Sequence, residues 1–237
     1  MTNVFYTDLH GAFLDRLDLR GIELQRAHLE GASLVEAHLE GVSLVEAHLN
    51  NANLVRAHLE EADLQGIHLE QATLGEAHLE GTLLYEAYLE GSELNGAFFD
   101  ANTALNDVIL GDEAHGFVSV AGVHWDGADL SVIDWTQVKK LGDEIKARQP
   151  ESFTVTPHEK KDPFLRLLEY RTAVRANRQL SVALRDQGLN EEAAHFAYRA
   201  QLMQRKVFWY QRKFGQYLFS LFLDLLAGYG FKPIRSF

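Results

Sequence analysis

The sequence predicts a β-solenoid followed by an α-helical hairpin, and two periodicities carry this prediction. Leucine recurs at every fifth position from Leu9 to Leu94. A five-residue step would rotate a helical leucine by about 140° and spread the series around the helix. In a flat strand, a five-residue step would place successive leucines on opposite faces, because five is an odd number. The backbone must therefore turn once per repeat. After Pro163 the apolar residues instead fall about four apart, as in helices.

The repeats of the N-terminal half pair each Leu with a small residue, usually Ala, two positions earlier. This residue suits a second inward site that has little room. Units such as AHLEG, ASLVE, ANLVR and ADLQG resemble the pentapeptide-repeat family over roughly residues 7–135. The resemblance implies a right-handed quadrilateral β-helix with four pentapeptides per coil, Leu and Ala inside and the other three positions outside. We predict this domain over residues 1–138.

A ten-residue period lies on top of the five-residue one, because His precedes Leu in alternate units and Glu follows it. With four sides per coil, this period stacks the histidines in two columns on opposite faces, each beside a Glu column. We predict these columns as the recognition surface. The predicted surface consists of His28, His38, His48, His58, His68, His78, Glu30, Glu40, Glu60, Glu70, Glu80 and Glu90.

Three roles for the histidine columns stay open: a stacked surface ladder, a pH-responsive ladder, since free His titrates near 6.5, and a divalent metal site. We expect the surface ladder and no metal or cofactor, because a convex column lacks the convergent geometry of a metal site. The leucine series loses phase between Phe99 and Trp125. An extra residue or a loop must interrupt the coil there, and we place the bulge at 114–117.

The C-terminal region divides into a charged linker, 139–162, and a helical module, 163–237. Pro163 suits a helix start and Gly188 a helix stop, and Asn190 is predicted to cap a second helix. That helix is predicted to continue past Val207 into an apolar, aromatic segment flanked by basic residues such as Lys232 and Arg235. This segment favours homo-oligomerisation or binding to an anionic membrane surface. The predicted contact residues are Trp209, Phe214, Phe219, Phe222 and Leu225.

The module also resembles cytoplasmic regions of bacterial pentapeptide-repeat proteins that continue into a small ion-channel-like membrane domain. The resemblance rests on the coils, the helical hairpin and the segment FLDLLAGYGFKP. It implies that this chain is the cytoplasmic part of a membrane protein, at the inner face of the membrane. We find no secretory signal and no long uncharged apolar run. The expected location is therefore the cytoplasm.

The amino-acid composition and the absence of known catalytic motifs limit the classes of function that this chain can have. The chain has no Cys, and it contains no phosphate-binding Gly loop, nucleophile elbow or zinc-protease motif. We therefore predict a non-enzymatic structural or interaction protein with an unidentified protein partner. Residues 1–138 carry 24 acidic and 4 basic side chains, against 10 and 18 in residues 139–237. The acidic rod leaves an alternative open, because some members of the family mimic DNA and bind DNA gyrase. Direct nucleic-acid binding is not expected.

Overall fold

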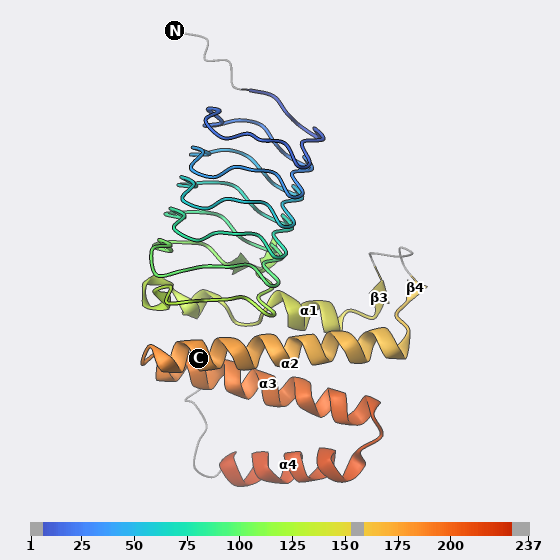
Figure 1. Cartoon of the computed structure of the whole chain (residues 1–237). Helices are drawn as coiled ribbons and strands as arrows, with labels where there is room; N and C mark the ends of the chain where they lie inside the picture. The colour runs from blue at the N-terminus through green and yellow to red at the C-terminus, as the bar shows by residue number, and fades with distance from the viewer. Residues whose placement is uncertain (1–6, 153–158, 229–237) are drawn as a thin grey trace.

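The computed structural model describes residues 7–152 and 159–228, and the side chains of 151, 152, 159, 160 and 226–228 lie outside this description. Stacked coils form one end of the molecule and helices the other (Figure 1). The elements are β1 (Gly111–Asp112), β2 (Gly116–Phe117), η1 (Leu130–Val132), η2 (Trp135–Gln137), α1 (Gly142–Arg148), β3 (Glu151–Ser152), β4 (Glu159–Lys160), α2 (Pro163–Asp186), α3 (Asn190–Tyr210) and α4 (Phe214–Gly228).

Each coil of the solenoid takes 20 residues, because parallel bridges join residue i to residue i+20, as in His28 to His48 and His48 to His68. Four pentapeptide sides therefore make one coil, as the family resemblance implies. At a corner, the Ala37 N–H donates to the Leu34 carbonyl at 3.1 Å and closes a β-turn. The third residue of this turn, Glu36, has φ +56°. Positive φ at this position is typical of a type II turn.

The interior of the solenoid is filled by the predicted leucines and small residues. From Leu24 to Leu94 the inward leucines are at most 3% exposed, and the inward alanines are at most 1% exposed. Leu9 and Leu14, in the first described coil, are only partly buried. The predicted division of each pentapeptide into two inward and three outward positions is confirmed.

The phase shift near residue 110 comes from two insertions. Leu83 bridges Ala104, one residue more than a full coil, and Glu93 bridges Ser119, which adds five more. The single extra residue follows Phe99 and the other five form the β1–β2 hairpin. The predicted bulge at 114–117 lies within this hairpin, whereas the first insertion was not predicted. The coil then resumes with Leu130 and Trp135 buried.

The helical region closes the C-terminal end of the solenoid. Leu180 and Leu184 of α2 and Phe196 of α3 belong to the same buried cluster as the coil leucines. The side chain of Gln187 accepts from the Leu130 N–H at 2.8 Å and donates to the Ala128 carbonyl at 2.7 Å. These contacts satisfy backbone groups that the last coil leaves without a next coil.

The segment predicted as a charged linker packs against the last coils over its described part, so the description of it as a connector needs correction. Its helix α1 buries two acidic residues, Asp143 and Glu144. Asp143 accepts from the Val120 N–H at 2.8 Å, and the Gly142 N–H donates to the Val118 carbonyl at 2.8 Å. These bonds continue the ladder of the solenoid into the helix. The domain boundaries at 138 and 163 stay a prediction.

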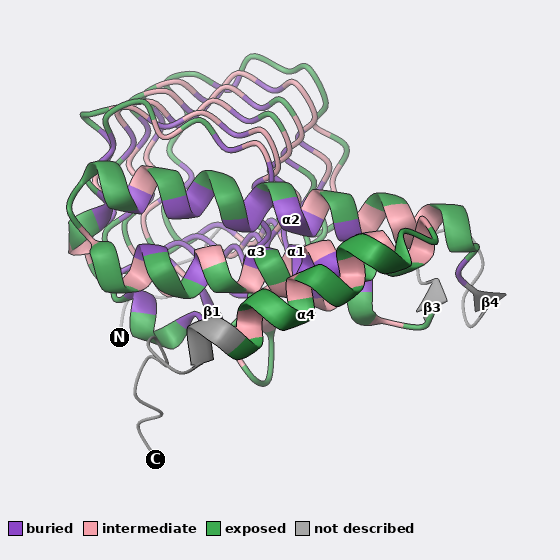
Figure 2. Ribbon diagram, turned by 90° about the horizontal axis from the view of Figure 1, so that it is seen from below, coloured by how far each residue is buried: buried purple, intermediate pink, exposed green. Residues whose placement is uncertain are grey.

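Helices α2 and α3 run side by side across the end of the coils, with α4 outside them (Figure 2). The helix predicted between Pro163 and Gly188 is confirmed as α2, which spans Pro163–Asp186. The Asn190 cap is wrong, because Asn190 is the first residue of α3 and its Nδ2 donates back to the Gly188 carbonyl at 3.1 Å.

The second helix does not continue into the apolar segment. It ends at Tyr210, and two residues later Arg212 adopts a φ of +57°. The N–H groups of Arg212 and Lys213 donate to the carbonyls of Trp209 and Phe208 at 3.0 and 2.9 Å. This is a Schellman motif, which usually has Gly at the left-handed position. An Arg there gives no breaker signal in the sequence, which is why one continuous helix was predicted.

Helix α4 folds back along α3 and is held there by a buried cation. Arg205, 8% exposed, forms an ion pair with Asp224 at 2.9 Å and donates to the Ser220 hydroxyl at 3.0 Å. Within the described part of the chain, no helix has both the length and the apolarity needed to span a membrane. The predicted flanking residues Lys232 and Arg235 lie outside the described residues.

Candidate interaction surfaces

The six predicted histidines form two stacked columns on opposite faces of the solenoid. The ring centroids of neighbouring histidines lie 4.8–5.2 Å apart and their rings are nearly parallel, as in the 6° between His38 and His58. The first column consists of His28, His48, His68 and Tyr88, and the second of His38, His58, His78, Phe98 and His124. The predicted stacking is confirmed. Its use for recognition stays a prediction.

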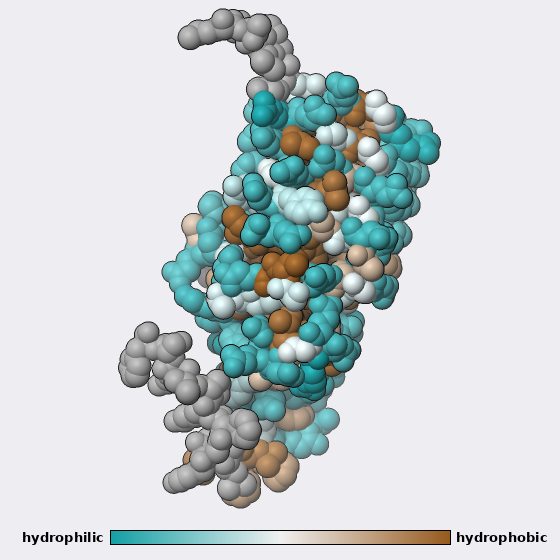
Figure 3. Space-filling view, turned by 90° about the vertical axis from the view of Figure 1, so that its left-hand side faces the viewer, coloured by the Kyte–Doolittle hydropathy of each residue, from teal (hydrophilic) through white to brown (hydrophobic). Residues whose placement is uncertain are grey.

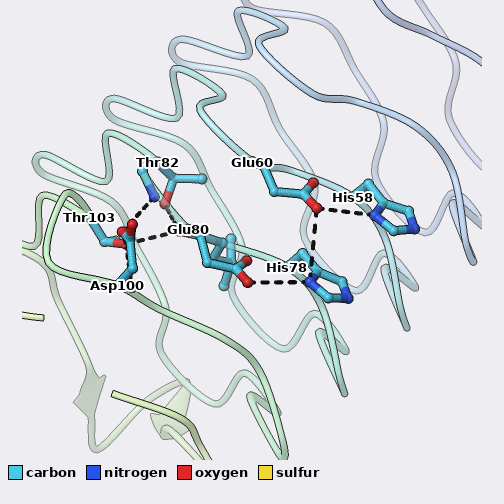
Figure 4. Close-up of polar contacts among 9 residues, drawn as sticks. His58, Glu60, His78, Glu80, Thr82, Asp100 and Thr103 are labelled. Carbon is cyan, nitrogen blue, oxygen red and sulfur yellow. Dashed lines mark hydrogen bonds and ion pairs between the residues drawn. The ribbon is translucent and has the colours of Figure 1, made fainter. Parts of the chain in front are cut away.

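The glutamates bond to the histidines two residues before them, so that each column is a ladder of His–Glu pairs. The Nδ1 atoms of His28, His38, His58, His68 and His78 lie 2.8–3.4 Å from the Oε1 atoms of Glu30, Glu40, Glu60, Glu70 and Glu80. In Figure 4, Glu60 lies between His58 and His78, and its Oε1 is 3.9 Å from His78 Nδ1. His48 departs from the pattern, because Asn50 follows it and donates to Glu70 at 2.5 Å.

The second carboxylate oxygens of this ladder are buried. Among the described residues, Oε2 finds no hydrogen-bond partner in Glu30, Glu40, Glu60, Glu80 and Glu90. Burial works to raise the pKa of Glu30 and Glu40. Hydrogen bonds from the preceding His and from the residue's own N–H outweigh burial and lower the pKa of both. These two glutamates are therefore held in the charged form that a cationic or hydrogen-bond-donating partner would recognise.

A groove of about 600 Å³ follows the second column and another of about 650 Å³ follows the first. One wall of each is aromatic, and the other is a ladder of alternating charges. Arg16 pairs with Glu36 at 2.8 Å and Arg56 with Glu76 at 2.7 Å beside the second column. Arg26 and Glu46 pair at 2.6 Å beside the first. Flat, polar grooves of this kind suit an extended chain better than a small enclosed molecule.

The face of the solenoid seen in Figure 3 is mostly hydrophilic, with hydrophobic side chains in small separate patches. The predicted apolar contact residues lie elsewhere, at the α3–α4 end. Trp209, Phe214, Phe219, Phe222 and Leu225 are 50–65% exposed. Figure 2 shows α4 as largely exposed. The sequence therefore identified an apolar surface that the described residues do not cover. What it binds stays a prediction.

Three groups of His and carboxylate side chains place their ligand atoms within 4.8 Å of one another. They are His38, Glu40 and His58; Glu60, His78 and Glu80; and Glu90, Asp112 and His115. The expectation that a convex column lacks convergent donors is therefore wrong for the first two groups, because stacking brings two coils into register. The third group joins a column glutamate to the β1–β2 hairpin. The sequence prediction missed it, because 22 residues separate Glu90 from Asp112.

The sequence prediction also missed a cluster of ion pairs that joins helices α1 and α3 of the cap. Glu144 is completely buried and pairs with Arg148 at 2.7 Å and with Arg199, whose Nε lies 2.9 Å from Glu144 Oε2. The (i, i+4) spacing of Glu144 and Arg148 was the available signal. Arg199 lies 55 residues away, so its contact depends on tertiary structure. This cluster is structural, because both of its carboxylate oxygens are occupied by guanidinium groups.

Comparison with known proteins adds a family match. Residues 5–41, 22–60, 32–71 and 62–100 match the family described as pentapeptide repeats, with eight copies. No curated protein matches. These matches indicate no enzyme family.

Among solved structures, a pentapeptide repeat protein, Rfr23, from the cyanobacterium Cyanothece 51142 is 27% identical, with 51% of this chain and 88% of that chain covered and a TM-score of 0.36. HetL of Nostoc sp. PCC 7120, a pentapeptide repeat protein involved in heterocyst differentiation regulation, is 28% identical over 52% and 61%, with a TM-score of 0.20. QnrB1, a plasmid-mediated fluoroquinolone resistance protein, is 18% identical over 52% and 80%, with a TM-score of 0.23.

Proposed function

Since residues 5–100 of this chain belong to the pentapeptide-repeat family, we propose that the chain is a non-enzymatic binding scaffold. Its β-helix presents the His–Glu columns to a protein partner, and α4 attaches the scaffold to an anionic membrane surface or to a second copy of the chain. A location in the cytoplasm, at the inner face of the membrane where α4 binds lipid, is part of this proposal. No cofactor enters the binding function.

The exposed apolar surface of α4 is the observation that carries the proposal. Phe219 and Phe222 are 61% and 52% exposed, and Leu218 and Leu225 are 63% and 65% exposed. A helix this apolar gains free energy when its surface leaves water, about 25 cal/mol for each Å² buried. Exposed apolar patches of this kind mark interaction sites. The ion pair between buried Arg205 and half-buried Asp224 holds the helix in place while leaving this surface accessible.

Charge near α4 favours an anionic partner for this surface. Lys206, Arg212 and Lys213 are exposed beside the α3–α4 turn. Each basic residue close to an anionic bilayer contributes about 1 kcal/mol at low ionic strength. Attachment to lipid should therefore weaken with salt, whereas apolar association between two copies should not.

The experiment is flotation of the full chain with anionic vesicles at low and high salt, beside light scattering for oligomeric state. The test variant is Phe219→Ser with Phe222→Ser, and the control is Val182→Ser, because Val182 is 54% exposed on α2 away from α4. Flotation lost only in the test variant supports lipid attachment. A dimer dissociated only by the test variant supports self-association. A protein that neither floats nor dimerises contradicts the proposal.

A second proposal is that the acidic rod mimics DNA and binds gyrase or another nucleic-acid-binding protein. Its support is the excess of 24 acidic over 4 basic side chains in residues 1–138 and the regular layers in which the glutamates stack. The Arg–Glu pairs of the ladders and the histidines of the columns reduce the number of free carboxylates. Inhibition of gyrase supercoiling by the full chain, in proportion to its concentration, would favour this proposal over the first.

A further inference from the structure

Glu90 occupies the place where the first column loses its histidine. Glu30 and Glu70 bond to the Nδ1 atoms of His28 and His68, two residues earlier. Tyr88 precedes Glu90 at this position and has no ring nitrogen. Glu90 is 6% exposed, and its Oε2 has no hydrogen-bond partner among the described residues, as is also true of Glu30, Glu40, Glu60 and Glu80. Those four glutamates have a histidine at Oε1, whereas no histidine stands two residues before Glu90. A buried, unpartnered carboxylate oxygen is costly and calls for an explanation.

On the opposite face, the acid at the corresponding position is Asp100, and it forms hydrogen bonds without a histidine. Asp100 follows Phe98, which also lacks a ring nitrogen, so its position corresponds to that of Glu90. Its Oδ1 accepts from the N–H groups of Gly81 at 2.8 Å and Asn102 at 3.0 Å and from the Thr103 hydroxyl at 3.0 Å. Figure 4 shows Asp100 beside Thr103. Losing the histidine therefore does not by itself leave the acid unpartnered. Glu90 differs from the other column glutamates in being buried, whereas they are half-buried.

The β1–β2 hairpin places two further side chains that can ligate a metal, Asp112 and His115, beside Glu90. Asp112 accepts from the Ala114 N–H at 2.9 Å through Oδ1, and its Oδ2 lies 3.0 Å from His115 Nδ1. A Cβ at Gly91, the residue after Glu90, would lie 2.4 Å from the His115 carbonyl oxygen. Glycine at 91 therefore lets the hairpin lie this close to the coil. As a result, ligand atoms of Glu90, Asp112 and His115 lie within 4.8 Å of one another.

We propose that Glu90, Asp112 and His115 bind a divalent first-row transition-metal ion, with Zn²⁺ as the reference ion. Two carboxylates and one imidazole form a donor set that such ions accept. The side chains of Asp112 and His115 are 42% and 54% exposed, which leaves an open side for entry of the ion and for water ligands. The cation would give the buried Glu90 carboxylate a partner and would join the hairpin to the coil. The site is independent of the proposed attachment through α4.

A proton is the competing occupant. Burial, together with the charges of Glu70 and Asp112, raises the pKa of Glu90. The hydrogen bond and charge of Asp112 raise the pKa of His115, with Glu90 and Glu70 adding to this. A metal must displace these protons, so binding should weaken as pH falls.

The experiment measures Zn²⁺ binding to the full chain at pH 7.5 by calorimetry, with Co²⁺ absorption spectra as a second measurement. The test variants are His115→Ala and Asp112→Asn, the latter because an Asn oxygen can still accept from the turn N–H groups. Glu113→Gln is the matched control, since it removes one charge from the same turn at a side chain that is 88% exposed. His58→Ala controls for ions held by the second column.

We expect both test variants to weaken the tightest Zn²⁺ site at least tenfold and to abolish the Co²⁺ absorption bands, while both controls retain them. Thermal unfolding without metal should be unchanged in Glu113→Gln and His115→Ala, which separates lost binding from lost folding. Absence of Zn²⁺ binding by the parent chain would leave a proton as the occupant and overturn the proposal. Binding that disappears with His58→Ala instead of His115→Ala would overturn it as well.

Discussion

The interior of the solenoid and its helical cap differ in the side chains that they bury. From Leu24 to Leu94 the solenoid buries two uncharged side chains in each pentapeptide, usually Leu and Ala, and most inner leucines have similar neighbours one coil above and below. The cap buries charged groups that occur once: Glu144 is 0% exposed and Asp143 is 4% exposed. The difference teaches that a repeated interior spreads its stability over many similar contacts, whereas a cap depends on a few ion pairs and hydrogen bonds.

The largest test of this comparison introduces a charge into the repeated interior. Leu54 is 1% exposed in the middle of the rod. Leu54→Asp loses the burial of a leucine side chain and places a carboxylate without a partner in an apolar interior, so we expect a loss of at least about 4 kcal/mol in the free energy of unfolding. Urea denaturation followed by circular dichroism measures it.

The control for this substitution is the neighbouring Asn53→Asp. It adds the same charge at an exposed position, where Asn53 Oδ1 accepts from the Val55 N–H at 3.2 Å and an Asp oxygen can do the same. We expect a change of less than about 0.5 kcal/mol. If Leu54→Asp unfolds at the same urea concentration as Asn53→Asp, the assigned register of the coils is wrong.

The second test removes one partner of the buried ion pair in the cap. Arg199→Ala leaves Glu144 with Arg148 alone, and breaking a buried pair in this way costs about 3–5 kcal/mol. The control is Arg178→Ala on α2, whose guanidinium donates to Gln204 at 3.2 Å in an exposed setting. We expect this control to cost less than about 1 kcal/mol. Equal urea midpoints for the two variants would contradict the importance of the Glu144 cluster.

The same difference explains which features could be predicted from the sequence. The inward leucines, the two histidine columns and the His–Glu pairing follow from periods of five and ten, because each contact joins residues at a fixed separation. The start of α2 at Pro163 and the stop near Gly188 follow from local backbone chemistry. All of these features depend on short-range patterns that recur or on residues with special φ.

The features that were mispredicted or missed depend on single long-range contacts. Nothing local shows that Arg199 will meet Glu144, or that His115 will lie beside Glu90. The helix break at Arg212 was missed because a left-handed Arg carries no sequence signal, although its Schellman hydrogen bonds are clear in the structure. The apolar α4 segment was recognised by its composition, but its folding back depends on the pair between Arg205 and Asp224.

The smallest of the predicted effects concerns Asp143, where the cap tolerates a buried acid. Burial raises the pKa of Asp143 from 3.8 to about 6. Between these two values the folded chain binds more protons at this site than the unfolded chain, so the contribution of Asp143 to stability falls as pH rises. Well above pH 6 the charged acid costs on the order of 3 kcal/mol relative to the protonated acid.

Asp143→Asn should remove this pH dependence, because the amide oxygen can still accept from the Val120 N–H without a charge. The difference in unfolding free energy between the variant and the parent should therefore be near zero at pH 4 and favour the variant by on the order of 3 kcal/mol at pH 7. Asp134→Asn is the control, and its effect on stability should have the opposite sign: hydrogen bonds from Thr136 and Gln137 lower the pKa of Asp134, so the variant should lose stability relative to the parent as pH rises. Parallel urea titrations at several pH values measure both. A difference between Asp143→Asn and the parent that does not change with pH would mean that the acid at the cap is satisfied as a charge, as the paired Glu144 is.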